Sequence, residues 1–159
     1  MREAIGGTWL FGLVITFIVF FASFLAVSIN YAKSFTVKNN LVDLITKYEG
    51  NNPCARKKMG NYLKQVGYLV TGSCPEKKED GTCLYIGYNQ NGEKLLNQNS
   101  KAYFWISEDN NDGTISLGKE YYRVVVFFKI DLPVIGDLVT FPIKGETESI
   151  PFVNEDTTC

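Results

Sequence analysis

The residues of this chain with the clearest chemistry are its cysteines, Cys54, Cys74, Cys83 and Cys159. An even number of cysteines in a small domain that follows an apolar segment is typical of disulfides formed in an oxidising compartment. A zinc site would need closely spaced ligand pairs such as C-x-x-C, and every gap between these cysteines is longer. We therefore predict two disulfides, in preference to free buried thiols or a metal site.

The two middle cysteines flank a charged turn, PEKKEDGT, between the β-rich pieces 68–74 and 83–89. A Cys74–Cys83 disulfide would close this hairpin. It would leave Cys54 to pair with Cys159, which would tie the carboxyl terminus to the start of a short helix. Four cysteines allow three pairings, so the sequence leaves the other two open.

Other reactive groups do not form a recognisable site. The chain has no histidine, which removes the commonest general base and metal ligand, and it carries no nucleotide-binding or hydrolase motif. Its acid pairs, such as Glu146 with Glu148, stand in turn-like segments. We expect no enzymatic activity, no cofactor and no small-molecule substrate. The net charge of −1 comes from scattered charges, so we expect no nucleic-acid binding.

One acidic turn resembles the start of a calcium loop, through Glu108, Asn110, Asp112 and Gly113. A calcium loop needs a bidentate Glu at its end, and Lys119 stands at that position. We therefore interpret this segment as a hairpin turn. We interpret the basic run Arg56–Lys57–Lys58 as a solvated helix face.

The element that must position everything else is an apolar segment near the start of the chain, residues 8–29. Residues 9–29 carry no charge, and as a helix they would extend about 31 Å, the thickness of a bilayer core. Signal peptides usually have shorter apolar regions of about 7–15 residues. Ala26–Val27–Ser28 could still serve as a cleavage site, so a removed signal stays an alternative to a membrane span.

Helical spacing of apolar residues continues past this segment, with Val37, Leu41, either Leu44 or Ile45, and Tyr48 on one side and lysines and asparagines on the other. We therefore predict one helix of about 40 residues, ending near Gly50, with its first half in lipid and its second half packed on a domain. A simple anchor followed by a separate helix is the alternative. The cysteines indicate that the N-terminus is cytoplasmic and the C-terminal domain extracytoplasmic.

The chain thus divides into an N-terminal helix, 1–50 (membrane span 8–29, amphipathic continuation 30–49), and an α+β domain, 51–159. Asn52 and Pro53 predict the start of a short helix that runs to about Gln65. Alternation from Tyr121 to Ile130 predicts the longest strand, with one apolar face on a helix. Pro142 and Pro151 indicate edge strands. The predicted fold is α+β, with the long helix packed on a small antiparallel sheet of about four to six strands.

Two segments carry a family resemblance: GGTWLFGLVITFIVFFASFLAVSINYAKSF (6–35) and YRVVVFFKIDLPVIGDLVTFPIKGETESI (122–150). Their layout resembles that of type IV pilin-like proteins, in particular the TadE-like minor pseudopilins of tight-adherence pilus and secretion systems. The resemblance implies that the apolar helices bundle in a filament core and the sheet domains face outward. It also implies peptidase cleavage at Gly6 or Gly7. The fifth residue after either cut is Phe11 or Gly12 instead of the family's Glu, which favours an atypical minor component.

Close helix packing in membranes uses small residues, and the span contains a predicted assembly face of Gly12, Ala22, Ser23, Ala26 and Ser28. The expected partners are the membrane and other pilin-like subunits or copies of this chain, in a surface filament or secretion apparatus. The alternative function is a monomeric, membrane-tethered binding domain that uses an aromatic sheet face. A secreted domain with a cleaved signal is a third.

Overall fold

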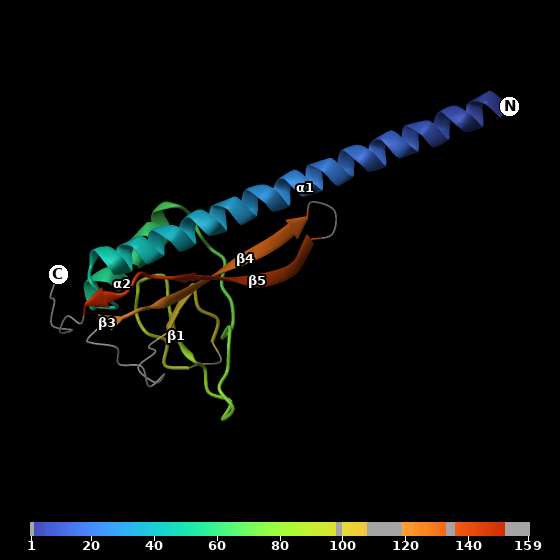
Figure 1. Ribbon diagram of the computed structural model, residues 1–159. Helices are drawn as coiled ribbons and strands as arrows, with labels where there is room; N and C mark the ends of the chain where they lie inside the picture. Colours follow the sequence, from blue (N-terminus) through green and yellow to red (C-terminus); the bar gives the residue numbers. More distant parts are fainter. Residues whose placement is uncertain (1, 98–99, 108–118, 133–135, 152–159) are drawn as a thin grey trace.

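One helix, α1 (Arg2–Lys47), runs without interruption through the apolar segment and along the domain (Figure 1). The computed structural model describes residues 2–97, 100–107, 119–132 and 136–151. The helix ends in a tight turn in which the N–H of Gly50 donates to the carbonyl of Ile45 at 3.0 Å. Glu49 and Gly50 both have positive φ there, 56° and 137°. The prediction of one long helix stopping near Gly50 is confirmed.

A short helix, α2 (Pro53–Gln65), follows directly, as predicted. The side chain of Asn52 caps it: Oδ1 accepts the N–H of Ala55 at 2.8 Å, and Nδ2 donates to the carbonyl of Tyr48 at 2.7 Å. Pro53 stands at the first helical position, where a missing N–H costs nothing. Asn52 thereby joins the end of α1 to the beginning of α2.

The β structure consists of a four-stranded antiparallel sheet and a separate two-stranded one. The larger sheet has the order β1-β2-β4-β5, built from β1 (Tyr85–Tyr88), β2 (Phe104–Ser107), β4 (Arg123–Leu132) and β5 (Gly136–Glu146). The smaller one pairs β3 (Lys119–Glu120) with β6 (Ile150–Pro151). These elements confirm the α+β class. The strand predicted at 121–130 is shifted by two residues, to 123–132, and it is not the longest, because β4 has 10 residues and β5 has 11.

β5 is an edge strand of the larger sheet, as Pro142 predicted. Phe127, opposite Pro142, directs its N–H to the Tyr68 hydroxyl on the other side of β4. The Phe127–Pro142 pair is therefore of the kind without mutual hydrogen bonds, and the nitrogen of Pro142 faces the free edge of the sheet. A proline is tolerated there because no ladder bond is lost.

The predicted β-rich piece 68–74 is not a strand, and its only ladder contact among described residues is a bridge between Gly72 and Ala102. The segment instead crosses over the face of β4. A Cβ atom on Gly72 would lie 2.2 Å from the Phe127 ring. This close approach requires glycine, and it shows why β-rich composition alone misassigned the segment.

Both faces of β4 are buried. Val124 and Val126 pack with Val37, Leu41 and Ile45 of α1, as the sequence predicted. On the opposite face, which was expected to be mixed, Val125 and Phe127 pack with Trp105 and other residues. The cause is the crossing segment and the disulfide loop, which cover this face.

The Cys74–Cys83 disulfide is present, with the two Cα atoms 5.9 Å apart. Its turn is closed by backbone hydrogen bonds, including one from the N–H of Lys78 to the carbonyl of Thr82 at 2.8 Å. Cys54 is buried in α2, and Cys159 lies outside the described residues. The Cys54–Cys159 disulfide therefore stays a prediction.

Candidate functional site

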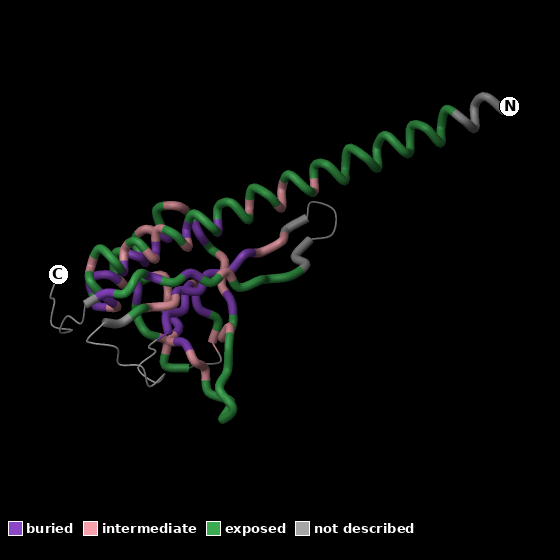
Figure 2. Tube along the Cα trace, viewed as in Figure 1, coloured by how far each residue is buried: buried purple, intermediate pink, exposed green. Residues whose placement is uncertain are grey.

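The most unusual surface of the described structure is the N-terminal part of α1, which projects from the domain (Figure 2). Every residue from 7 to 22, here called the bare half, is exposed, and Trp9 and Phe20 are 74% and 68% exposed. Burial of one large apolar side chain contributes about 1.5–3 kcal/mol. Contiguous apolar surface on this scale is typical of contact with lipid or protein. Among described residues, α1 is the one helix long and apolar enough to span a membrane.

The C-terminal part of α1, residues 31–47, here called the packed half, turns one face to the sheet. Val37, Leu41 and Ile45 on this face are buried. The same face continues toward the N-terminus at helical spacing, through residues that are buried or partly exposed: Ser34, Asn30, Val27, Ala26 and Ser23. One side of α1 is therefore less exposed as far back as Ser23, in the last third of the predicted span.

The predicted assembly face is not a single face. At 3.6 residues per turn, Ser23 lies about 20° from Gly12 around the helix, whereas Ser28 lies about 160° away. Ser23 and Ala26 stand on the side of α1 that the domain covers, and both are only partly exposed. Gly12, Ala22 and Ser28 are exposed. Because Ser28 lies almost opposite Gly12, Gly12 and Ala22 are the exposed members that lie nearest to each other around the helix.

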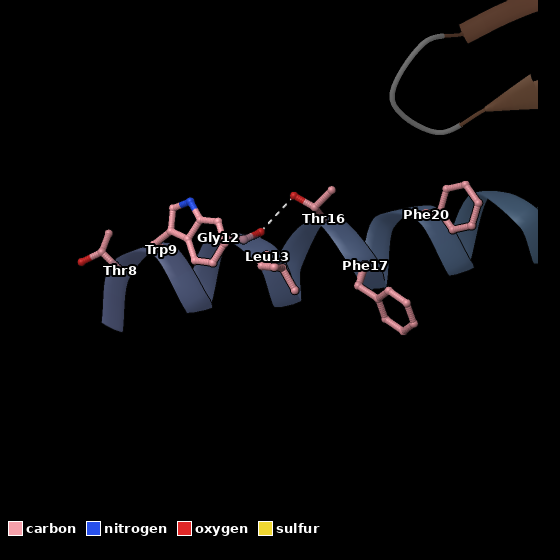
Figure 3. Close-up of a pocket in the computed structure, with 7 residues that line it drawn as sticks. All are labelled: Thr8, Trp9, Gly12, Leu13, Thr16, Phe17 and Phe20. Atoms are coloured by element: carbon pink, nitrogen blue, oxygen red, sulfur yellow. Dashed lines mark hydrogen bonds between the residues drawn. The ribbon is translucent and has the colours of Figure 1, made fainter. Parts of the chain in front are cut away.

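Gly12 forms the floor of an open apolar groove on the bare half (Figure 3). The groove is lined by Thr8, Trp9, Gly12, Leu13, Thr16, Phe17 and Phe20. A Cβ atom on Gly12 would have no neighbour within 4 Å. In contrast, Gly60, Gly72 and Gly92 each meet atoms of their own chain closer than 3.0 Å. The glycine at position 12 thus has no packing reason within the described part of the chain, and it leaves room for a second helix.

Three hydroxyl groups of the span make hydrogen bonds within the helix itself. Thr16, Ser23 and Ser28 each donate to the carbonyl four residues earlier, at 2.9 Å. Such bonds remove the cost of placing these polar groups in lipid. The polar residues of the span are therefore compatible with a hydrocarbon environment.

An aromatic group that the sequence analysis missed lies where the bare half meets the domain. Tyr31 stacks on Phe35 at 6.3 Å and meets Phe128 edge-on at 5.7 Å, and Phe128 stacks on Phe141 at 6.4 Å, all between ring centroids. We call these four residues the boundary cluster. The sequence signal was present: Tyr31 and Phe35 are four apart directly after the apolar segment. Their pairing with β4 and β5, however, depends on tertiary register.

Tyr68 makes hydrogen bonds to β4 at Phe127, one residue before Phe128 of the boundary cluster. Its hydroxyl donates to the carbonyl of Phe127 and accepts the N–H of Phe127 at 3.0 Å. Burial raises the pKa of Tyr68 to about 12, despite hydrogen bonds from Phe127 and Ser34 that act in the opposite direction. A phenol this weakly acidic stays neutral at physiological pH, so its role is to hold the crossing segment on β4.

The remaining predicted sites have separate outcomes. The aromatic sheet face is closed, because Tyr85, Tyr88, Phe104 and Trp105 are all buried. The calcium-like residues 108, 110, 112 and 113 lie outside the described residues. Within the described ranges, no cluster of three potential metal ligands occurs. Lys57 and Lys58 are exposed, as predicted for a solvated face. Arg56 is not part of such a face, because it is half-buried, donates to the carbonyl of Asn51 at 2.6 Å and lies over the Tyr88 ring.

The candidate cleavage residues Gly6 and Gly7 both lie within α1, in its first turns, ahead of the groove at Gly12. The comparison of this chain with family models, curated proteins and solved structures gives no match.

Proposed function

We propose that this chain is a non-enzymatic, pilin-like (TadE-like) structural subunit of a surface pilus or secretion apparatus. Residues 8–29 anchor it in the membrane, the N-terminus is cytoplasmic and the domain lies outside. Assembly uses the bare half of α1. The observation that carries the proposal is the continuity of α1, which joins a bare apolar half rigidly to a half that belongs to the core of the domain.

Rigid continuity favours a structural role over a simple tether. A flexible linker would let the domain move independently of its anchor. Here Leu41 and Ile45, in the same helix as the span, are 0% exposed in the core. Any contact between two spans therefore fixes the relative position of two domains, as a filament subunit requires.

The groove at Gly12 supports the choice of contact. Small residues let helix backbones approach closely in membranes, where van der Waals packing drives association. Gly12 and Ala22 are exposed and lie about 80° apart around the helix, and a Cβ atom on Gly12 would meet no neighbour within 4 Å. The Cys74–Cys83 disulfide supports the placement of the domain in an oxidising compartment.

The test is assembly of the full chain in its native membrane, measured by cross-linking and by imaging of sheared surface material. We expect Gly12→Leu and Ala22→Leu to abolish higher-order species, because each fills the space that a second helix needs. Ser28→Leu is the matched control, since it adds the same side chain on the opposite side of α1.

Equal assembly of all three variants would overturn the proposal. Intact mass measurement of the purified native protein is a second test. A mature chain that starts near Ile29 would lack the bare half, and the assembly role would fail with it.

A further inference from the structure

The hairpin of β4 and β5 runs back along α1 toward its N-terminus (Figure 1). The contact of Tyr31 with Phe128 fixes the two elements relative to each other. From Phe128, β4 continues four residues to Leu132, about 13 Å of strand. On α1 that length equals about nine residues, which brings the end of β4 to the level of Ala22 or Ser23.

The partial burial of Ser23, Ala26 and Val27 agrees with this position. All three belong to the predicted span, residues 8–29. The end of β4 therefore lies at the level of the last residues of the span.

The exposed side chains at this level are apolar and aromatic, with lysines beside them. Tyr31 and Phe141 are 51% and 45% exposed, and Val139, two residues nearer the hairpin end, is 46% exposed. Leu69, 72% exposed, borders a cleft of about 160 Å³ that Lys33 and Lys129 also line. Aromatic rings with neighbouring long cationic side chains are the composition of a membrane–water interface.

We infer that the β4–β5 hairpin is a second membrane contact, with Phe141 and Val139 seated in the headgroup region of the outer leaflet. The inference rests on the proposed function in one respect, that α1 spans the bilayer. It does not depend on filament assembly. The partner is the bilayer surface itself, because the hairpin continues the lipid-facing segment of the same helix without a gap.

The charges limit how deeply the hairpin enters. Asp131 and Asp137 are partners in the register of the two strands, and carboxylates in hydrocarbon are costly. The hairpin should therefore stay among the headgroups.

The experiment places a fluorescent reporter in the hairpin of the full chain, reconstituted at one copy per nanodisc of phosphatidylcholine. Phe141→Trp in a Trp9→Phe background is compared with Leu96→Trp in the same background. Leu96 is 99% exposed and follows β1, the opposite edge of the sheet. Trp105 is 1% exposed and gives a constant baseline. Lipids brominated at the upper acyl chain quench tryptophans near the interface.

We expect Phe141→Trp to lose emission about as strongly as Trp9 does in the unmodified chain, and Leu96→Trp to be unaffected. Val139→Trp, about 7 Å nearer the hairpin end, should be quenched more by deeper bromines. It also serves as the second reporter if a tryptophan at 141 disturbs the stack on Phe128.

Quenching of Trp9 without quenching at 141 or 139 would overturn the inference and leave anchoring intact. Loss of Trp9 quenching would instead show that α1 is not inserted. Shielding at 141 only in discs that hold several copies would assign the surface to a second subunit, which also overturns the contact with lipid.

Discussion

The two halves of α1 share one helical backbone, but the apolar side chains of the two halves have different surroundings. In the packed half, Leu41 is buried by the sheet; in the bare half, Leu13 of the same residue type is 54% exposed. The packed half is stabilised by burial against the sheet, whereas the bare half needs lipid or another protein to cover its apolar side chains. The difference teaches that a continuous helix can carry two energetically separate segments, and that mutations in each should be detected by different measurements.

The largest effect should come from the core. We expect Leu41→Ala to lower the free energy of unfolding of the domain by about 3 kcal/mol, because a buried leucine leaves a cavity. Leu13→Ala in the bare half should leave it unchanged. Denaturation in detergent micelles, followed by Trp105 emission in a Trp9→Phe background, measures both. Equal effects of the two variants would break the distinction between the halves.

The second effect is a pH dependence of the stability of the domain, which arises from Tyr68. The pKa of Tyr68, about 12 in the folded chain, is above the ordinary tyrosine value of about 10. The contribution of the neutral Tyr68 phenol to the free energy of unfolding is fully present below pH 10. It is lost as the pH rises through 12, and the loss amounts to up to about 3 kcal/mol. Unfolding measured across this range should show a steeper loss in the wild type than in Tyr68→Phe. Parallel curves would contradict the assigned role.

A pair of glycine variants gives the next contrast. Gly72→Ala should destabilise the domain by about 1–3 kcal/mol, because the added methyl group enters the Phe127 ring. Gly12→Ala adds the same group in open space and should leave domain unfolding unchanged. Thermal melts of both variants in micelles test this, and a destabilised Gly12→Ala would show that the bare half packs on the domain.

The smallest effect concerns the far end of the packed half. Asn52→Ala removes the cap of α2 and the hydrogen bond to Tyr48, and should cost about 1 kcal/mol. Asn52→Asp keeps the acceptor and should recover most of that loss. Denaturant titration of the two variants distinguishes the capping role from general loss of packing.

The elements that the sequence predicted correctly depend on local signals. Asn52 and Pro53 encode the start of α2, the charged turn encodes the Cys74–Cys83 loop, and Pro142 marks an edge strand. The missed features depend on contacts between distant segments. Residues 68–74 have the composition of a strand, yet Gly72 and Tyr68 pack on Phe127 instead of entering the sheet. The boundary cluster likewise needs the register of β4 against α1, which no local pattern contains.

The candidate site shows the same division. The length of the span and its continuation as a helix could be predicted from composition and periodicity. Which small residues stay exposed could not, because the partial burial of Ser23 and Ala26 is a property of the folded chain. Gly12 and Ala22 were distinguished from them only by the folded domain.

The hydroxyl of Tyr68 has one more consequence, for solubility. Described pairing of β4 with β2 stops at Val125, and an unpaired backbone position beyond it would be a template for strands of other chains. Tyr68 occupies both the N–H and the carbonyl of Phe127, two residues further along β4. A single phenol thus takes the place of a neighbouring strand at Phe127 and closes that position to intermolecular β-pairing.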